Sequence, residues 1–247
     1  MNRRTRIALF ALSAAGVGAL LLWGLAGLPS FGDYAGPYGD LIANLAPPQR
    51  HIANAVTAVV FDYRGFDTMG EELILFLAAS AVALILRETR DYHVDDVVDA
   101  VRSDALAGLG ILSAIALLLM SLYVISHGLV TPGGGFQGGV LVAASFVLVF
   151  YTVEYRAYAR IATTKFGEPL EAFGAGAYVG LGLISFAFGL AFLENFIDLG
   201  VTGRLRSGGS AALVNWASAL AVAGGFLVIF SEYIQENMAE RHRRKKP

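Results

Sequence analysis

The chain contains no cysteine in 247 residues, and only 15% of its residues are charged. An average soluble domain carries roughly 25% charged residues. The lack of cysteine excludes a disulfide framework, a thiolate metal site and a thiol nucleophile. We expect no cofactor, and nothing in the composition indicates binding to nucleic acid. Hydrophobic residues are abundant instead, at 56%, with a mean hydropathy of +0.60.

Several apolar runs reach about 18 residues or more, which is the length that a transmembrane helix needs. Lipid offers no partner to unpaired backbone groups, so these runs should be helical, and their unbroken character argues against a β-barrel. The sequence therefore predicts an all-α, polytopic membrane protein with about six transmembrane helices. A broken helix is expected near 61–70 and a glycine-rich helical hairpin at 127–139. The apolar runs are 7–28, 52–61 resumed at 73–86, 105–125, 140–155, 171–193 and 211–233.

Three regions follow from these runs. Residues 1–50 form a first transmembrane helix and an extracytoplasmic loop, residues 51–104 a broken-helix segment and a charged cytoplasmic connector, and residues 105–247 four helices and a basic tail. The first run exceeds the roughly 7–15 residues of a signal-peptide core and lacks an A-x-A site, so we expect it to be retained. Four valines of the connector, at 94, 97, 98 and 101, predict a short amphipathic helix.

The basic residues predict the orientation of the chain. With a cytoplasmic N-terminus, 14 of the 18 Lys and Arg residues fall in inside segments and 4 in outside segments. Positive charge favours the cytoplasmic side, so both termini are expected there, in the cell (inner) membrane. The glycine-rich hairpin then faces outside.

Ionisable residues are missing from the middle of five of the six apolar runs. Proton and ion relays across a membrane normally need such groups, so the chain is expected to be one component of a larger transporter. Glu154, Glu194 and Glu232 are expected at helix ends, in contact with water or head groups. A Gly176-x-x-x-Gly180 motif is expected to let two helices pack closely.

The first polar break reads F-D-Y-R-G-F-D-T-M-G-E-E, from Phe61 to Glu72. Its spacing predicts a capping box with Thr68 as N-cap and Glu71 reaching back to it. Asp62 and Arg64 could form a pair that steadies the bend. The alternative is functional: Asp67 and Glu71 would stand where water or cations reach the protein interior beside a broken helix. The residues alone leave both interpretations open.

The second break, Ser126 to Val140, reads S-H-G-L-V-T-P-G-G-G-F-Q-G-G-V. It matches G-x-G-x-x-G, but no strand precedes it, so a dinucleotide site is excluded; a P-loop lacks its Lys-Ser/Thr. Thr131 is expected as the N-cap of a helix with Pro132 in its first turn. The amides of Gly133 to Gly135 would then point a partial positive charge at the bend. His127 ends the preceding helix and is either a titrating group or an interfacial anchor.

Both breaks resemble motifs of one family. The stretch from His127 to Val140 resembles the signature of the MnhB/MrpB-like component of multisubunit Mrp-type Na⁺/H⁺ antiporters, and also its equivalent in energy-converting membrane-bound hydrogenases. The stretch from Phe61 to Glu71 resembles the C-terminal end of the large, MnhA-type antiporter component, or a small hydrogenase protein. Here the two units look fused. Two departures stand out: Gln137 replaces a usually apolar residue, and Asn215 lies where relatives carry an acidic one, so that a polar contact could be lost.

The resemblance implies a membrane subunit of a monovalent cation/proton antiporter that contributes to sodium translocation. Its partners would be the large antiporter-like subunits, the small membrane subunits and the lipid bilayer. The chain would have no catalytic group and no resident metal, with sodium bound only transiently at Glu71. The implied ion pathway consists of Asp67, Glu71, His127, Thr131, Pro132, Gly133, Gly134, Gly135, Phe136, Gly138 and Gly139, with Asp62, Arg64 and Thr68 in secondary positions.

Two other functions stay open. The chain could be a non-catalytic ion-coupling subunit of a complex I-like membrane-bound hydrogenase or oxidoreductase. It could also be a scaffold whose two bends only fit neighbouring helices. The proteins that accompany it in the native membrane would distinguish these functions.

Overall fold

A computed structural model describes residues 2–30, 32, 36–86, 103–153, 155–161 and 164–245. The expected amphipathic helix at 94–101 and Glu154 lie outside these residues. The elements, in chain order, are α1 (Arg3–Ala26), α2 (Pro37–Arg50), α3 (Ala55–Ala58), the π-helical turn η1 (Val59–Tyr63), α4 (Gly65–Ile85), α5 (Asp104–Ser126), α6 (Gly135–Thr152), α7 (Tyr155–Ile161), α8 (Thr164–Ala187) and α9 (Ala211–Lys245).

The chain divides into two compact units, residues 1–41 and residues 42–247. The first unit holds α1 and the beginning of α2, and α1 contributes no buried residue to it. The second unit holds the remaining helices and both polar breaks, so the candidate site lies entirely within it.

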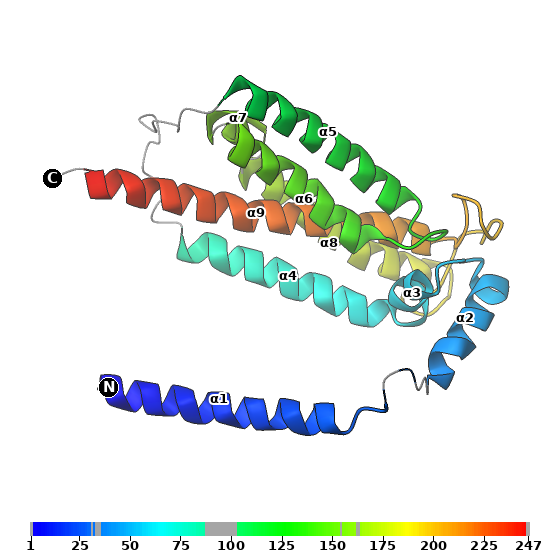
Figure 1. Cartoon of the computed structure of the whole chain (residues 1–247). Coiled ribbons are helices and arrows are strands. Elements are labelled where there is room, and N and C mark those ends of the chain that lie inside the picture. The colour runs from blue at the N-terminus through cyan, green and yellow to red at the C-terminus, as the bar shows by residue number, and fades with distance from the viewer. Residues whose placement is uncertain are drawn as a thin grey trace. The chain divides into compact units, whose positions relative to one another are not determined.

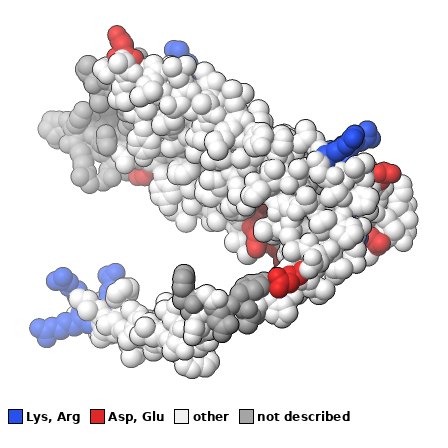
Figure 2. All heavy atoms as spheres, turned by 45° about the vertical axis from the view of Figure 1, so that its right-hand side comes forward, with Lys and Arg blue, Asp and Glu red and all other residues white. Residues whose placement is uncertain are grey.

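The all-helical prediction is confirmed. Among the described residues, six helices are long and apolar enough to cross a membrane: Arg3–Ala26, Gly65–Ile85, Asp104–Ser126, Gly135–Thr152, Phe166–Ala187 and Ala211–Met238. Figure 2 shows the corresponding surface, on which charged side chains gather near the ends of the helices and leave long uncharged stretches between them. The chain is therefore a multi-pass membrane protein.

Helix α9 is the centre of the second unit. It packs against α8, α6 and α4, and Figure 1 shows it running lengthwise among them. Two thirds (67%) of its apolar window is buried, against 17% for α5. Its buried face is made of small residues such as Ala217, Ala221 and Gly224, which let neighbouring backbones approach.

The close contact between α8 and α9 uses a glycine other than those expected. A methyl group at Gly174 of α8 would lie 2.2 Å from the backbone nitrogen of Ala221. Methyl groups at Gly176 and Gly180 would meet no atom within 4 Å, so the prediction that this pair mediates packing is wrong for contacts within the described chain. Helical periodicity brings only one face of α8 to α9, and Gly174 is on that face.

Two helices extend beyond their apolar runs. Helix α8 begins at Thr164, seven residues before Glu171, and α9 continues past Tyr233 to Lys245. Hydrophobicity ends at the membrane boundary, but Glu, Gln, Lys and Arg are good helix formers and do not end a helix. The expectation that Glu232 meets water at a helix end is wrong, because its side chain is completely buried, whereas Glu194 is exposed as expected.

Candidate functional site

The two polar breaks meet at one pocket of about 240 Å³ at the end of the second unit where α4, α6 and α9 begin. The segment from α3 through η1 to the start of α4, which contains the first break, contributes residues that include the carboxylate of Glu71. The second break contributes Gly133, Phe136 and Gln137. The complete lining is Val56, Thr57, Val60, Phe61, Thr68, Glu71, Gly133, Phe136 and Gln137. Glu71 is the charged residue of this lining.

The first break is a change of helix type rather than a loop. Asn54 caps α3 by accepting hydrogen bonds from the amides of Val56 and Thr57 at 3.1 and 3.4 Å. The backbone then widens into η1 and turns at Arg64, whose φ of −130° interrupts the helix before α4 begins at Gly65. Such π-helical turns often mark functional sites, since they redirect side chains out of the regular helical pattern.

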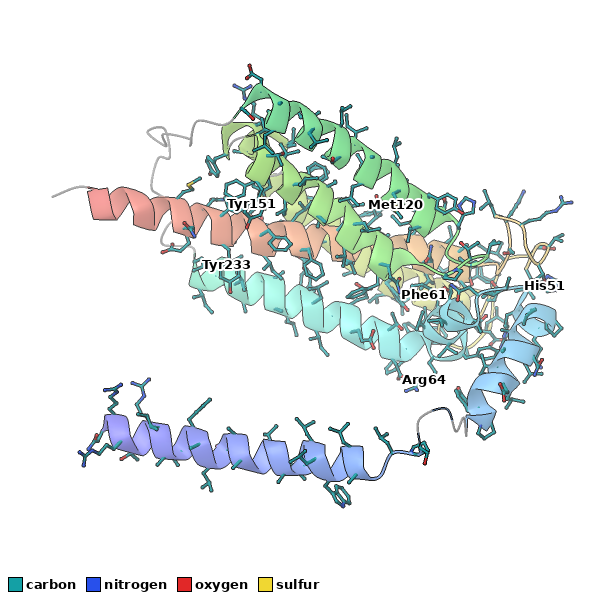
Figure 3. All side chains as sticks on the ribbon, in the orientation of Figure 1. His51, Phe61, Arg64, Met120, Tyr151 and Tyr233 are labelled. Atoms are coloured by element: carbon teal, nitrogen blue, oxygen red, sulfur yellow. The ribbon has the colours of Figure 1, made fainter. Side chains whose placement is uncertain are left out.

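The ion pairs of this break differ from the expected one. Asp62 pairs with Arg50 of α2 at 3.3 Å, and Arg64 pairs with Asp67, three residues later on the exposed surface. The prediction that Asp62 pairs with Arg64 is therefore wrong, because the change of helix type turns the two side chains apart. Figure 3 shows Arg64 pointing away from the bundle. Burial raises the pKa of the Asp62 carboxyl above its ordinary value, and the guanidinium of Arg50 opposes this shift.

The predicted capping box is also wrong. Arg64 occupies the N-cap position of α4 without a side-chain hydrogen bond, and Thr68 lies inside the first turn, where it is buried. The helix begins four residues earlier than a cap at Thr68 would place it. Its first residue, Gly65, is held from another helix, because the Tyr178 hydroxyl of α8 donates to the Gly65 carbonyl at 2.9 Å. Glu71 is thus not engaged in capping and faces the pocket.

The second break is held by polar side chains at the start of α3, the helix that leads into the first break. The side-chain amide of Asn54 donates to the carbonyls of Gly128 and Thr131 at 2.8 and 2.9 Å. The hydroxyl of Thr57 donates to the Gly128 carbonyl at 2.7 Å. These bonds satisfy carbonyls of the turn that follows α5, so the segment leading into the first break and the second break form a single hydrogen-bonded unit.

His127 does end α5, as predicted. Its ring stacks on Tyr123 with 4.0 Å between ring centroids, and its Nδ1 lies 3.2 Å from the Tyr123 carbonyl. It is absent from the pocket lining, so the structure does not bring it together with Glu71. Asp67, on the exposed surface with Arg64, is likewise outside the lining.

Helix α6 begins later than expected. Gly134 is the N-cap of α6, which starts at Gly135, so the predictions of Thr131 as N-cap and Pro132 in the first turn are wrong. The physical reason is the backbone of Gly133 and Gly134, whose φ angles of +144° and +139° carry the chain past a second bend before the helix starts. The hydroxyl of Thr131 bonds back to the His127 carbonyl at 3.4 Å.

The remaining glycines of the motif are packing positions. A methyl group at Gly135 or Gly139 would lie 2.0 or 2.7 Å from a carbonyl oxygen of α9, and one at Gly138 would lie 2.2 Å from Ile125 of α5. The spacing of four residues from Gly135 to Gly139 puts both on one helix face, toward α9. These glycines therefore let α6 sit against both neighbours while its first turn lines the pocket.

Asn215 lies where relatives carry an acidic residue, and it makes the polar contact that this difference had put in doubt. Its side chain is buried, accepts a hydrogen bond from the Gly135 amide at 2.7 Å and donates one to the Ile125 carbonyl at 2.9 Å. The Gly135 amide is consequently not available to an ion. The second departure, Gln137, adds an amide group to the pocket lining.

Of the predicted pathway residues, the structure brings together Glu71, Gly133 and Phe136, with the secondary residue Thr68. It adds two polar residues that sequence reasoning missed, Asn54 and Thr57, and it gives Asn215 a contact that the sequence had left in doubt. Asn54 carried a signal that could have been read, since Asn before a short helix is a typical N-cap. The others reveal their role only through contacts across the fold.

Comparisons with known proteins identify the family of the chain. A profile described as a domain related to the MnhB subunit of Na⁺/H⁺ antiporter matches residues 106–228, which contain the whole second break. The chain belongs to this MnhB-related family. An uncharacterised protein of Methanocaldococcus jannaschii is 34% identical to this MnhB-related chain over 163 residues, covering 60% of the chain and 62% of that protein.

A second relative, a probable K⁺/H⁺ antiporter A/B subunit of Rhizobium meliloti, is 29% identical over 121 residues. That alignment covers 39% of the MnhB-related chain and 12% of the Rhizobium protein. The chain thus spans less than two thirds of both curated relatives that it matches.

Two solved structures share the fold. A chain of the membrane-bound sulfane sulfur reductase, an archaeal respiratory membrane complex, is 30% identical with a TM-score of 0.68, covering 93% of the MnhB-related chain and 98% of its own length. A chain of the Mrp complex from Dietzia sp. DQ12-45-1b is 26% identical with a TM-score of 0.69, covering 94% and 26%. Both are parts of multisubunit membrane complexes.

Proposed function

We propose that this chain is a membrane subunit of a multisubunit monovalent cation/proton antiporter, and that the pocket at Glu71 is part of its cation route. The observation that carries the proposal is the meeting of both polar breaks at one pocket with a carboxylate in its wall. Family membership and the likeness to a chain of an Mrp complex support the same conclusion. The chain itself would carry out no catalysis.

The pocket has the chemistry that a small monovalent cation requires. Such ions prefer carboxylate, carbonyl and amide oxygens, and the lining offers those of Glu71 and Gln137. Helix termini and non-helical backbone are tolerated at membrane depth where they line a cavity, and discontinuous helices build ion sites in this way in other transporters. The exposed pair of Asp67 and Arg64 would stand near the entrance rather than in the wall.

We also propose that both termini face the cytoplasm and that the pocket opens toward the outside. The distribution of basic residues supports this orientation. The presence of two separate family motifs in one chain supports the fusion of an MnhA-type end with an MnhB-type domain. The Rhizobium relative, named as an A/B subunit, is consistent with that fusion.

The test is cation-driven proton movement in vesicles that contain the assembled complex. Glu71→Gln removes the charge in the pocket, and Phe136→Ala removes a side chain of its wall; each is expected to lower exchange and to raise the sodium concentration at half-maximal rate. Glu194→Gln is the matched control, because Glu194 is an exposed carboxylate outside the pocket lining. Wild-type exchange in both pocket variants would contradict the proposed route. Parallel assays with potassium identify the cation.

A second candidate is an ion-coupling role in a respiratory membrane complex. It is favoured by the sulfane sulfur reductase chain, 98% of which is covered by this one. Purification of the chain from its native membrane distinguishes the two. Large antiporter-like proteins alone favour the antiporter, and accompanying redox proteins favour the respiratory complex.

A further inference from the structure

Three carboxyl groups lie deep in the second unit and are not part of the pocket lining. Glu72 of α4, Glu171 of α8 and Glu232 of α9 have 2%, 3% and 0% of their surface exposed. These three helices pack against one another, and Figure 1 shows α9 running beside both α4 and α8. The antiporter route proposed above makes no use of any of them.

Glu72 follows Glu71 in the chain but faces α9 instead of the pocket. Its Oε1 accepts a hydrogen bond from the hydroxyl of Ser218, and its Oε2 has no hydrogen-bond partner among the described residues. The titratable groups near it are Tyr178 from α8 and Glu71 from its own helix. From α9, the facing polar group is the Ser218 hydroxyl.

Glu171 is seated against a pair of glycines. A methyl group at Gly225 would lie 2.8 Å from Glu171 Oε1 and 3.2 Å from Leu75 of α4, so the absence of a side chain there makes room for the carboxyl. Glu171 Oε1 also has no hydrogen-bond partner among the described residues. Glu168, one turn earlier on α8, is the titratable group near it.

The three carboxyls follow one stripe of α9. Ser218, Gly225 and Glu232 are seven residues apart, which is close to two helical turns, so they share a face of the helix. At 1.5 Å per residue, each step is about 10 Å and the whole stripe about 21 Å, two thirds of a hydrocarbon core of about 30 Å. A line of acids therefore runs from beside the pocket toward the opposite end of the bundle.

Ionised carboxylates at buried positions such as Glu72 and Glu171 would be costly. An ionised group without a partner in a low-dielectric interior costs several kcal/mol, and no ion pair joins Glu72 or Glu171 to a basic residue within the described part of the chain. Ionisable residues inside a membrane protein are rarely kept without a function, and chains of acids are typical of proton relays. The neighbours of the Glu171 carboxyl include Gly225 and Leu75, whose side chains offer no oxygen ligands. A metal cation needs several oxygen ligands, so this position suits a proton better.

We propose that Glu72, Glu171 and Glu232 form a proton path along α9, next to the cation pocket and separate from it. A carboxylate takes up a proton, becomes neutral, and returns to its carboxylate form when it passes the proton on. Steps of about 10 Å exceed a hydrogen bond of about 2.7 Å, so water must enter between the levels during transfer. Because Glu71 and Glu72 are adjacent, a cation in the pocket and a proton on Glu72 repel each other, which links the two movements. The proposal rests on the antiporter function proposed above.

The test uses the complete complex in vesicles, with sodium uptake and proton movement measured separately. Glu171→Gln is expected to lower cation-coupled proton movement at least about tenfold, as loss of a proton-transfer group does elsewhere, with assembly retained. The sodium concentration at half-maximal rate is expected to stay unchanged, unlike in Glu71→Gln. Glu168→Gln is the matched control, since it makes the same change on the exposed side of α8.

Proton movement at the wild-type rate in both Glu72→Gln and Glu171→Gln would overturn the proton path while leaving the cation pocket standing. A normal sodium response in Glu71→Gln, with proton movement lost in Glu171→Gln, would instead refute the pocket and support the path. If the complex with Glu171→Gln fails to assemble, Glu171→Asp is the second variant, because it keeps the carboxyl group on a shorter side chain. The pH profile of exchange in Glu171→Asp should be shifted from that of the wild type. An unshifted profile in that variant would also overturn the proposal.

Discussion

The backbone amide of Gly135 donates a hydrogen bond of 2.7 Å to the side-chain oxygen of Asn215. This bond joins the first turn of α6 to the first turns of α9, and the same asparagine donates to the end of α5 through Ile125. One buried side chain therefore sets the relative positions of three helices around the pocket.

Replacing Asn215 with alanine should destabilise the fold strongly. Both the Gly135 amide and the Ile125 carbonyl would lose a buried partner, which costs about 2–4 kcal/mol in total. We expect a lower midpoint of thermal unfolding in detergent micelles. Asn237→Ala, which replaces an exposed asparagine on the same helix, is the control and should unfold as the wild type does. Equal midpoints for the two variants would show that the contact contributes nothing.

A methyl group at Gly135 should separate α6 from α9. The Gly135→Ala methyl would lie 2.0 Å from the Asn215 carbonyl oxygen, so the backbones must move apart, at about 1–3 kcal/mol. Gly180→Ala adds the same methyl group where no atom of the described residues lies within 4 Å, and it should be neutral or slightly stabilising. Thermal unfolding of the two variants under identical conditions makes the comparison. A destabilised Gly180→Ala would instead reveal a contact outside this chain.

The Arg50–Asp62 pair predicts a pH-dependent defect. Burial raises the pKa of Asp62 above its ordinary value of 3.8, and Arg50 holds that shift back. A raised pKa means that the group's contribution to stability is fully present below the unfolded pKa and is lost as pH rises through the folded one. Without Arg50 the pKa should rise further, so Arg50→Met should cost about 1–2 kcal/mol at pH 8 and much less near pH 4, measured by thermal unfolding.

The double variant Arg50→Met/Asp62→Asn is the control for this pair. It removes the ionisable group, so its unfolding midpoint should change little between pH 4 and pH 8. A defect in Arg50→Met that is equally large at both pH values would point to lost packing of Arg50 on the Tyr63 ring, 5.4 Å from it, rather than to charge.

The absence of cysteine makes the orientation directly testable. A single cysteine in place of Arg204, in the exposed loop before α9, should react with a membrane-impermeant maleimide in intact cells. A cysteine in place of Lys245 in the basic tail should react only after the membrane is opened. The reverse pattern would invert the proposed topology and place the pocket on the cytoplasmic side.

The sequence did not predict that Glu72 is buried against α9, although it predicted a functional role for the neighbouring Glu71. Adjacent residues of a helix differ in direction by about 100°, so which one faces the pocket depends on where the helix begins. That start depends in turn on Gly65 and Tyr178, which are far apart in the chain. The early start of α4 explains why the capping box at Thr68 was wrong, whereas the N-cap at Thr131 was wrong because Gly133 and Gly134 delay the start of α6.

Hydrophobic run length and local motifs are properties of consecutive residues, so they were sufficient to predict the all-helical membrane fold, the two polar breaks and the family. Three further features became visible only in the folded chain: the breaks share one pocket, Asn215 joins the hairpin to α9, and the buried acids Glu72, Glu171 and Glu232 lie alongside α9. These are contacts between distant segments, and they depend on helix rotation and exact helix bounds, to which the hydrophobic pattern of a membrane helix is almost insensitive.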